Sequence, residues 1–315
     1  MDSSISLRLK IRDRKLNINI AFLVISLILL AWSLNQISQA TSSILIKRSV
    51  SILRTLIYFG LFISWGLSIQ RRVMQKQVKT YLTIISGLMV FWLAIRSIKY
   101  FFVRGDLNLF RYLWYAYYIP ELMIVLMSLF IALSIRKPEN YRLPSWIKIL
   151  YLPTFTLIGL VLTNDYHEMV FIFSDGITRK TIQYKHNTVF WIIFAWLIIN
   201  ALIALIVILS RSKIPRSKKI VWLPFLPLLA SIIYTFIYVF WYPLIGRFAN
   251  DMTVVLCLLI ISIFESCIYT GLIRSNRHYD KLFYASAMNG LIVDKDYKIH
   301  YKSKGAHDLT VETLR

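Results

Sequence analysis

Cysteine is scarce in this sequence, and so are the residue patterns that mark catalytic or metal sites. Both of the two cysteines, Cys257 and Cys267, lie in the last long apolar run, and neither a Cys-x-x-Cys spacing nor a Cys/His cluster occurs. These absences argue against disulfides and structural zinc. A nucleophile with its base, or a set of His and Asp ligands, is not recognisable either. We therefore expect no catalytic residue, no metal and no cofactor in this chain.

Acidic residues are also few. The chain has 15 Asp and Glu against 37 Lys and Arg, which gives a formal net charge of +22. In a soluble protein such an excess would indicate nucleic-acid binding, but here the basic residues gather in alternate loops between apolar runs. This asymmetry is the positive-inside pattern, and it predicts that both termini are cytoplasmic. We therefore expect no nucleic-acid partner.

Long polar stretches are missing as well, because 57% of the residues are hydrophobic. An apolar run of about 20 residues can cross the roughly 30 Å hydrocarbon layer of a bilayer. Eight such runs occur, at about 18–38, 50–69, 80–102, 112–135, 147–163, 188–210, 220–245 and 252–273. They predict an all-α polytopic membrane helix bundle with about eight transmembrane helices, in contact with the lipid bilayer. The first run, followed by Ser38-Gln39-Ala40, also fits a cleaved signal peptide, which would leave seven crossings; we favour the uncleaved helix.

The chain divides into three regions. Residues 1–17 form a basic cytoplasmic tail, residues 18–273 form the transmembrane region, and residues 274–315 form a cytoplasmic linker with a different composition. The last region has an amphipathic helix pattern, then "GLIV", an Asp-Lys-Asp turn and the alternating strand "YKIHYKS". This order predicts the start of a soluble α/β module. About 40 residues are too few to bury a core of their own.

Several stretches resemble the seven-helix membrane sensor region at the N-terminus of bacterial histidine kinases. They are "WYAYYIPELMIVLMSLFIALSI", "LPSWIKILYLPTFTLIGLVLTNDYHEMVF" and "WLPFLPLLASIIY", and the likeness spans about 50–273. The tail is similar to the opening of a PAS domain, with Asp280 and Phe283 in its first helix and "NGLIVDKDYKIHY" as its first hairpin. The resemblance implies a two-component signal sensor in the bacterial plasma membrane, a homodimer that passes its signal to a cytoplasmic output.

The output itself is not recognisable in the sequence. A phosphoacceptor box needs a proline shortly after its histidine and acidic residue, and neither His167-Glu168 nor His307-Asp308 has one; glycine-rich nucleotide-binding segments are also absent. We expect a sensor without a catalytic domain, a truncated kinase, or a partner of a separate kinase or response regulator. A secondary transporter is the alternative, although we find none of the inverted repeats that such proteins often carry.

Ionisable residues inside the predicted spans indicate where function lies, because each is costly in hydrocarbon. Arg96 and Lys99 share a helix face, and the short connection after them brings Glu121 to a similar depth, with Arg54 near the same level. One hypothesis is an ion pair between Glu121 and Arg96 or Lys99 that fixes helix packing. The other makes these four residues the floor of an outward-open pocket for an anionic or zwitterionic ligand. Its walls would include Tyr115, Tyr117 and Tyr118, although such aromatics also form interfacial belts.

Two residues are candidates for coupling the pocket to the cytoplasm. Pro120 is expected to kink its helix. Glu265, near the cytoplasmic end of the last run, is either a proton-sensitive coupling residue or a hydrogen-bond partner of Ser262 or Asn200. Outside the membrane, Asp165, His167 and Glu168 are acceptable metal ligands, but their loose spacing favours a hydrated loop end.

Overall fold

The computed structural model describes residues 22–103, 106–135, 137, 141–173, 184–210, 222–241, 251–275, 291–293 and 299–302. Its helices are Phe22–Ala40, α2 (Ile44–Arg72), α3 (Lys76–Phe101), α4 (Leu107–Tyr115), α5 (Tyr118–Ser134), the 3-10 helix η1 (Ser145–Leu150), α6 (Tyr151–Leu162), α7 (Asn164–His167), α8 (Thr188–Ser210), α9 (Phe225–Phe240) and α11 (Met252–Tyr269). Its strands are β1 (Phe171–Phe173), β2 (Tyr184–His186), β3 (Leu291–Val293) and β4 (Ile299–Lys302). The predicted all-α bundle is confirmed.

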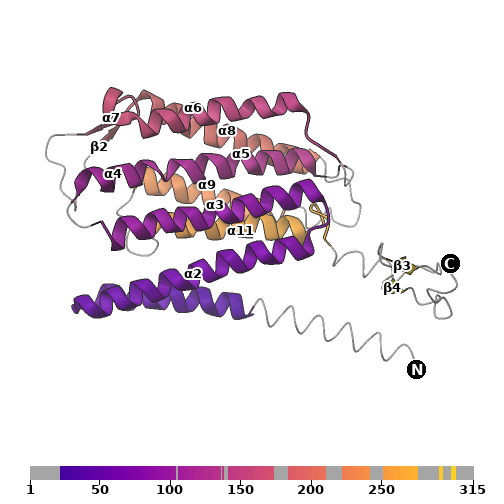
Figure 1. Cartoon of the computed structure of the whole chain (residues 1–315), viewed down its shortest axis with the longest axis horizontal. Coiled ribbons are helices and arrows are strands. Elements are labelled where there is room, and N and C mark those ends of the chain that lie inside the picture. The colour runs from indigo at the N-terminus through magenta and orange to yellow at the C-terminus, as the bar shows by residue number, and fades with distance from the viewer. Residues whose placement is uncertain are drawn as a thin grey trace.

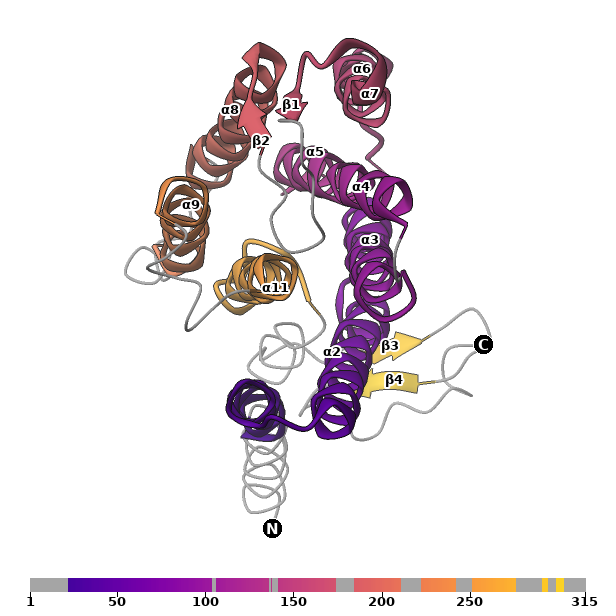
Figure 2. The same ribbon diagram turned by 90° about the vertical axis from the view of Figure 1, so that its left-hand side faces the viewer.

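The long helices lie side by side along one direction (Figure 1). Seen end-on, α6, α5, α3 and α2 form one row, α8 and α9 lie across from it, and α11 lies between the two (Figure 2). α11 contacts α3 on one side and α9 on the other. We call the end of the bundle with α7, β1 and β2 the hairpin end. The opposite end, from which the chain continues beyond α11, is the tail end (Figure 1).

Each of the eight predicted apolar runs falls on helix. Seven helical stretches of the described chain are long and apolar enough to cross a membrane. The eighth, α9, has 16 residues where the sequence predicted a span over 220–245. Of the predicted span, residues 220–221 and 242–245 lie outside the described part of the chain. The fold is thus that of a multi-pass helical membrane protein.

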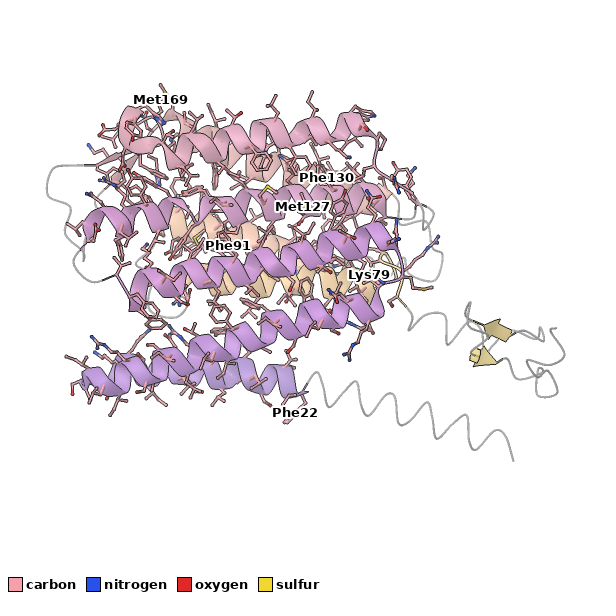
Figure 3. The ribbon with its side chains drawn as sticks, viewed as in Figure 1. Phe22, Lys79, Phe91, Met127, Phe130 and Met169 are labelled. Carbon is pink, nitrogen blue, oxygen red and sulfur yellow. The ribbon has the colours of Figure 1, made fainter. Side chains whose placement is uncertain are left out.

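Apolar side chains cover the outside of the bundle as well as its inside. Met127 and Phe130 of α5 are each 1% exposed, whereas Phe22 and Phe91 are 71% and 45% exposed (Figure 3). A soluble monomer rarely exposes so many large apolar side chains together. Helices satisfy their own backbone hydrogen bonds, so an outer surface of this kind fits the hydrocarbon of a lipid bilayer.

The predicted span 112–135 is divided into two helices, α4 and α5, by a two-residue turn. The cause is Pro120, which has no backbone N–H to donate to the carbonyl oxygen four residues earlier, on Ala116. That oxygen instead accepts from the N–H of Ile119 at 3.3 Å, across one residue fewer than in an α-helix. Pro120 thus interrupts the regular α-helical hydrogen bonding in the turn before it, and a kink of the helix axis stays a prediction.

Helices α2 and α3 approach each other closely at Gly66. A Cβ atom at this position would lie 2.2 Å from Ser86 Oγ and 2.9 Å from Ser86 Cβ. The Ser86 hydroxyl cannot turn away freely, because it donates a 3.0 Å hydrogen bond to the carbonyl oxygen of Phe62. Small residues at such crossings are how membrane helices pack backbone against backbone.

Gly66→Ala is therefore expected to destabilise the protein by about 1–3 kcal/mol, the usual cost of overpacking. Gly60→Ala, on the same helix, is the matched control, because a Cβ there meets nothing within 4 Å; we expect it to be neutral or slightly stabilising. Thermal melting of the purified protein in detergent would measure both. Ser86→Gly should restore much of the loss in the Gly66→Ala background, and equal melting temperatures for the two alanine variants would contradict this account of the crossing.

The segment after α11 turns back to the bundle before it reaches the tail. Gly271 has φ 76°, a left-handed conformation that glycine adopts without strain. Beyond it, the N–H of Met74 donates to the carbonyl oxygen of Arg274 at 3.3 Å, and Val73 forms a β-bridge with Ser275. The turn between α2 and α3 thus binds the chain that leaves α11.

The tail contains the predicted hairpin. β3 pairs antiparallel with β4, Leu291 opposite Lys302 and Ile292 opposite Tyr301. The amphipathic helix predicted before it, with Asp280 and Phe283, lies outside the described residues. A hairpin alone does not define a PAS domain, so the assignment of the tail remains a hypothesis.

Candidate functional site

A cavity of about 1270 Å³ lies among the helices. Its lining comes from α2, α3 and α5 in one row, from α8 and α9 across from them, and from α11; Trp114 of α4 and Tyr184 and His186 of β2 contribute at the hairpin end. Pockets for drug-sized ligands measure roughly 300–1,000 Å³. This cavity is larger, and it has room for an extended ligand.

The structure brings six of the seven residues predicted for the pocket to this cavity. They are Arg54, Arg96, Lys99, Tyr117, Tyr118 and Glu121. Tyr115 was expected in the wall as well, but its ring is fully buried elsewhere, among side chains of α5, α6, α8 and β1. The wall prediction for Tyr115 is therefore wrong. Tyr117 and Tyr118, which follow the end of α4, do lie in the lining.

The predicted pair between Glu121 and Arg96 is also wrong. Arg96 forms an ion pair of 2.5 Å with Asp251, the residue that caps the N-terminus of α11. Arg54 donates a hydrogen bond to Asn35 of the first helix. Glu121 is half-buried in the lining, and the ion pairs among the described residues do not include it. Asp251 is the partner of Arg96 because its position at the start of α11 places its carboxylate directly against α3.

Lys99 lies in a pocket of aromatic rings. Its Nζ is 4.4 Å from the ring centroid of Phe110, 4.9 Å from that of Tyr117 and 5.2 Å from that of Tyr100. The residue is only 3% exposed, and no carboxylate in the described part of the chain lies within ion-pair distance of it. Ring faces attract an ammonium group by their quadrupole, so they hold this cation without neutralising it.

Two further donors in the lining lack an acceptor. The Oη of Tyr117 and the Nε1 of Trp92 are buried, and neither has a hydrogen-bond partner within the described residues. Both residues line the cavity. Buried polar groups without partners are rare, and each calls for an explanation such as an unseen ligand or ion.

An aromatic cluster lies over the hairpin end of the cavity. The ring of Trp114 lies 4.6 Å from that of Phe171 and 4.8 Å from that of Tyr184, and His186 stacks on Phe190 at 3.7 Å. Burial lowers the pKa of His186 below its ordinary value. The ring is therefore neutral at pH 7, and the positive charge at this end comes from the lysines and arginines of α2 and α3.

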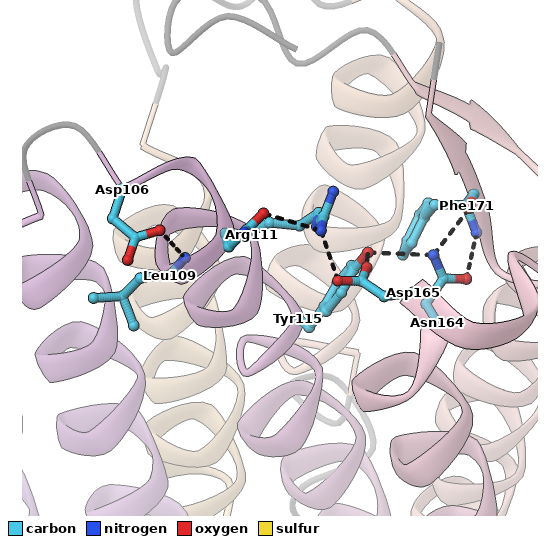
Figure 4. Close-up of polar contacts among 8 residues, drawn as sticks. Asp106, Leu109, Arg111, Tyr115, Asn164, Asp165 and Phe171 are labelled. Carbon is cyan, nitrogen blue, oxygen red and sulfur yellow. Dashed lines mark hydrogen bonds and ion pairs between the residues drawn. The ribbon is translucent and has the colours of Figure 1, made fainter. Parts of the chain in front are cut away.

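Tyr115 belongs to a polar network beside this cluster (Figure 4). Its hydroxyl donates to Asp165 Oδ1 at 2.7 Å, and Arg111 donates to Asp165 Oδ2 at 2.7 Å. Asn164 Oδ1 accepts from the N–H groups of Val170 and Phe171 at 2.9 and 3.0 Å. Its Nδ2 donates to the carbonyl oxygen of Phe171 at 2.9 Å and to the Tyr115 hydroxyl at 3.3 Å. This network fixes β1 against α4.

The metal hypothesis for the same segment has no geometric support. Both oxygens of Asp165 already accept hydrogen bonds, and His167 Nδ1 accepts from the N–H of Met169 at 3.0 Å. In the described ranges, no three His, Cys, Asp or Glu side chains are placed to share an ion.

Glu265 lies at the tail end and does not line the cavity. Arg72 Nη1 donates to its Oε2 at 2.9 Å, Arg72 Nη2 contacts its Oε1, and Trp65 Nε1 donates to the same Oε1 at 2.9 Å. The predicted partners, Ser262 and Asn200, instead donate to carbonyl oxygens of their own helices. Pro120 also lies outside the lining, in the first turn of α5.

Sequence reasoning missed Asp251, Trp92 and Arg72. Asp251 carried a usable signal, because an aspartate directly before an apolar run marks a helix N-cap. Trp92 and Arg72 carried no such signal. Trp92 lies in a span among other apolar residues, and Arg72 lies in a basic loop of the sequence. Family models, curated proteins and solved structures were all compared with the chain, and none of them matches it.

Proposed function

We propose that this chain is a membrane-embedded receptor of the two-component type. In this proposal the cavity takes up a small anionic or zwitterionic ligand, and the bound state changes how the tail engages a cytoplasmic output. That output is a separate histidine kinase, a response regulator, or a kinase domain continuous with the tail, and the receptor works as a homodimer. The hairpin end faces outward and both termini are cytoplasmic, which follows the distribution of basic residues.

The observation that carries the proposal is the position of α11. At its start Asp251 pairs with Arg96 in the cavity, and near its end Glu265 pairs with Arg72. The two acidic residues lie roughly 21 Å apart along the axis, at about 1.5 Å per residue. One rigid helix therefore connects the charged end of the cavity with the segment that leads into the tail.

A ligand can shift an equilibrium only through contacts that differ between two states. The Arg96–Asp251 pair offers such a contact, because an anion that binds near Arg96 competes with Asp251 for the same guanidinium. Weakening this pair frees the start of α11 while Arg72 and Trp65 hold its other end. The tail would then report the change as an altered orientation of α11 against α2.

Site-specific photo-crosslinking in cells of the source organism tests the proposal. A photoreactive residue is placed at Tyr301 of β4 and, as the matched control, at Tyr166, which is 88% exposed at the hairpin end. We expect position 301 to capture a second copy together with a histidine kinase or a response regulator, identified by mass spectrometry, and position 166 to capture neither signalling protein. Capture of kinases from position 166, or of no signalling protein from position 301, would contradict the proposal, as would solute accumulation by proteoliposomes that contain only this chain.

A further inference from the structure

The hairpin end of the cavity holds an excess of donors over acceptors. Within the described residues, the ammonium of Lys99 has aromatic rings around it and no carboxylate within ion-pair distance, and the buried Tyr117 hydroxyl has no hydrogen-bond partner. The Nε1 of Trp92 is a third donor, two helical turns deeper. An unpaired buried donor costs about 1–3 kcal/mol, and acceptor oxygens on a ligand would remove that cost.

The net charge of the lining also favours a ligand with negatively charged oxygens. Among the described residues that line the cavity, five are basic and two are acidic; the basic ones are Lys47, Arg48, Arg54, Arg96 and Lys99, and the acidic ones are Glu121 and Asp251. Asp251 is already paired with Arg96. All seven lie towards the hairpin end of their helices. A ligand with an oxyanion there would complete the hydrogen bonds of Lys99 and Tyr117 and offset this charge.

The rest of the cavity is long and apolar. The lining from α8 runs from Phe190 to Ile208, roughly 27 Å at about 1.5 Å per residue, and consists of apolar residues throughout. Leu228 and Ile232 of α9, with Leu256 and Ile260 of α11, face the same space. Ser231 and Thr235 also line it, but their hydroxyls donate to carbonyl oxygens of their own helix. This part therefore suits a hydrocarbon chain.

We propose that the cavity binds an anionic amphiphile, with a carboxylate or phosphate head at Lys99 and Tyr117 and one long hydrocarbon chain along α8, α9 and α11. This inference rests on the proposed function for its biological meaning, but binding itself does not depend on it. A free fatty acid and a single-chain phospholipid share this chemistry. A small anion such as acetate would leave most of the cavity unfilled, and a neutral lipid would leave the positive charge of the lining without a counter-charge.

Direct binding to the full chain in nanodiscs of phosphatidylcholine tests the inference. The probe is radiolabelled palmitate, displaced by unlabelled palmitate, methyl palmitate, hexadecyl phosphate, single-chain phosphatidate, acetate or inorganic phosphate. We expect palmitate or one of the two phosphate amphiphiles to compete at least tenfold better than the methyl ester, which has the same chain without the charge, and far better than either small anion. The ranking of the carboxylate against the two phosphates identifies the natural head group.

Two conservative variants locate the head. Lys99→Gln should weaken palmitate binding on the order of 10- to 100-fold, and Tyr117→Phe roughly tenfold, in line with hydrogen bonds to a charged acceptor. Neither change should alter the residual binding of methyl palmitate. Both variants should fold, because neither removes a hydrogen bond or an ion pair between described residues. Lys79→Gln is the control, a lysine of α3 at the tail end and outside the cavity (Figure 3).

Three results would overturn the inference. The first is that methyl palmitate competes as well as all three anionic amphiphiles, the second is that acetate or inorganic phosphate competes as well as they do, and the third is an unchanged palmitate affinity in a folded Lys99→Gln protein. Melting curves show whether each variant is folded. The readout needs neither the tail nor a signalling partner. Specific palmitate binding together with failed crosslinking at position 301 would therefore reject the receptor and keep the ligand class, and the converse result would do the opposite.

Discussion

Arg96→Gln and Asp251→Asn are each expected to destabilise the protein by about 3 kcal/mol, and the double variant is expected to recover most of that loss. The side chains of the pair are only 12% and 15% exposed, so removing one partner leaves the other charge poorly solvated. Breaking a buried ion pair on one side costs about 3–5 kcal/mol, whereas replacing both charges is often nearly neutral. We place the single losses at the low end because the pair borders a cavity that can hold water. Detergent melting curves of the four proteins form the double-mutant cycle.

The chain offers a matched control for this cycle. Asp106 caps α4 by accepting from the N–H of Leu109 at 2.9 Å, as Asp251 caps α11, but it is exposed and belongs to no ion pair of the described residues. Asp106→Asn keeps a capping side chain and should change stability by less than about 0.5 kcal/mol. Combining Arg96→Gln with Glu121→Gln should give additive losses. If the Arg96→Gln/Glu121→Gln protein were instead more stable than either single variant, Arg96 and Glu121 would be paired, which would contradict the ion pair between Arg96 and Asp251.

Asn164→Ala is expected to cost about 3 kcal/mol or more. Asn164 is fully buried, and its amide is the hydrogen-bond partner of two N–H groups and a carbonyl of the segment 170–171. Each buried polar group left unpaired costs about 1–3 kcal/mol, and alanine leaves three. The change should loosen β1 first, so hydrogen exchange at the amides of Val170 and Phe171 should accelerate before the bundle itself melts.

The control for Asn164 is Asn108→Ala. Asn108 is exposed and accepts one 3.3 Å bond from Arg111, so we expect no measurable loss of stability. Asn164→Asp should also be destabilising, because it keeps the oxygen that accepts from Val170 and Phe171 but loses both amide donors. A melting temperature of Asn164→Ala within error of the Asn108→Ala value would mean that water replaces the amide at this site.

The helices were predictable because a single physical requirement, about 20 apolar residues per crossing, dominates the sequence. The break between α4 and α5 has a similarly local cause, since the missing N–H of Pro120 acts only on its own turn. Pairings across the bundle were not. The sequence placed Arg96 and Glu121 at a similar depth correctly, yet depth alone cannot choose between Glu121 and Asp251 when both lie near the hairpin end.

In the site, too, local features were predictable from the sequence and contacts between helices were not. Charges in the spans identified four residues of the cavity, because an ionisable group in hydrocarbon has few other uses. Tyr115 was misassigned because a two-residue turn after α4 rotates the aromatic run, so that Tyr117 and Tyr118 face the cavity while Tyr115 faces Asp165. A run of five aromatics carries no internal mark that fixes this rotation. The unpaired donors Trp92 and Tyr117 are visible only once their surroundings are known.

The β-bridge between Val73 and Ser275 determines where a foreign output domain should be joined to this protein. Because Arg274 and Ser275 are bound to the turn between α2 and α3, the rigid body does not stop where α11 stops, at Tyr269. A foreign output domain joined directly after Tyr269 would lose this attachment and with it the angle at which the chain leaves the membrane. A junction placed beyond Ser275 keeps both, so the phase of any helical linker should be counted from Ser275.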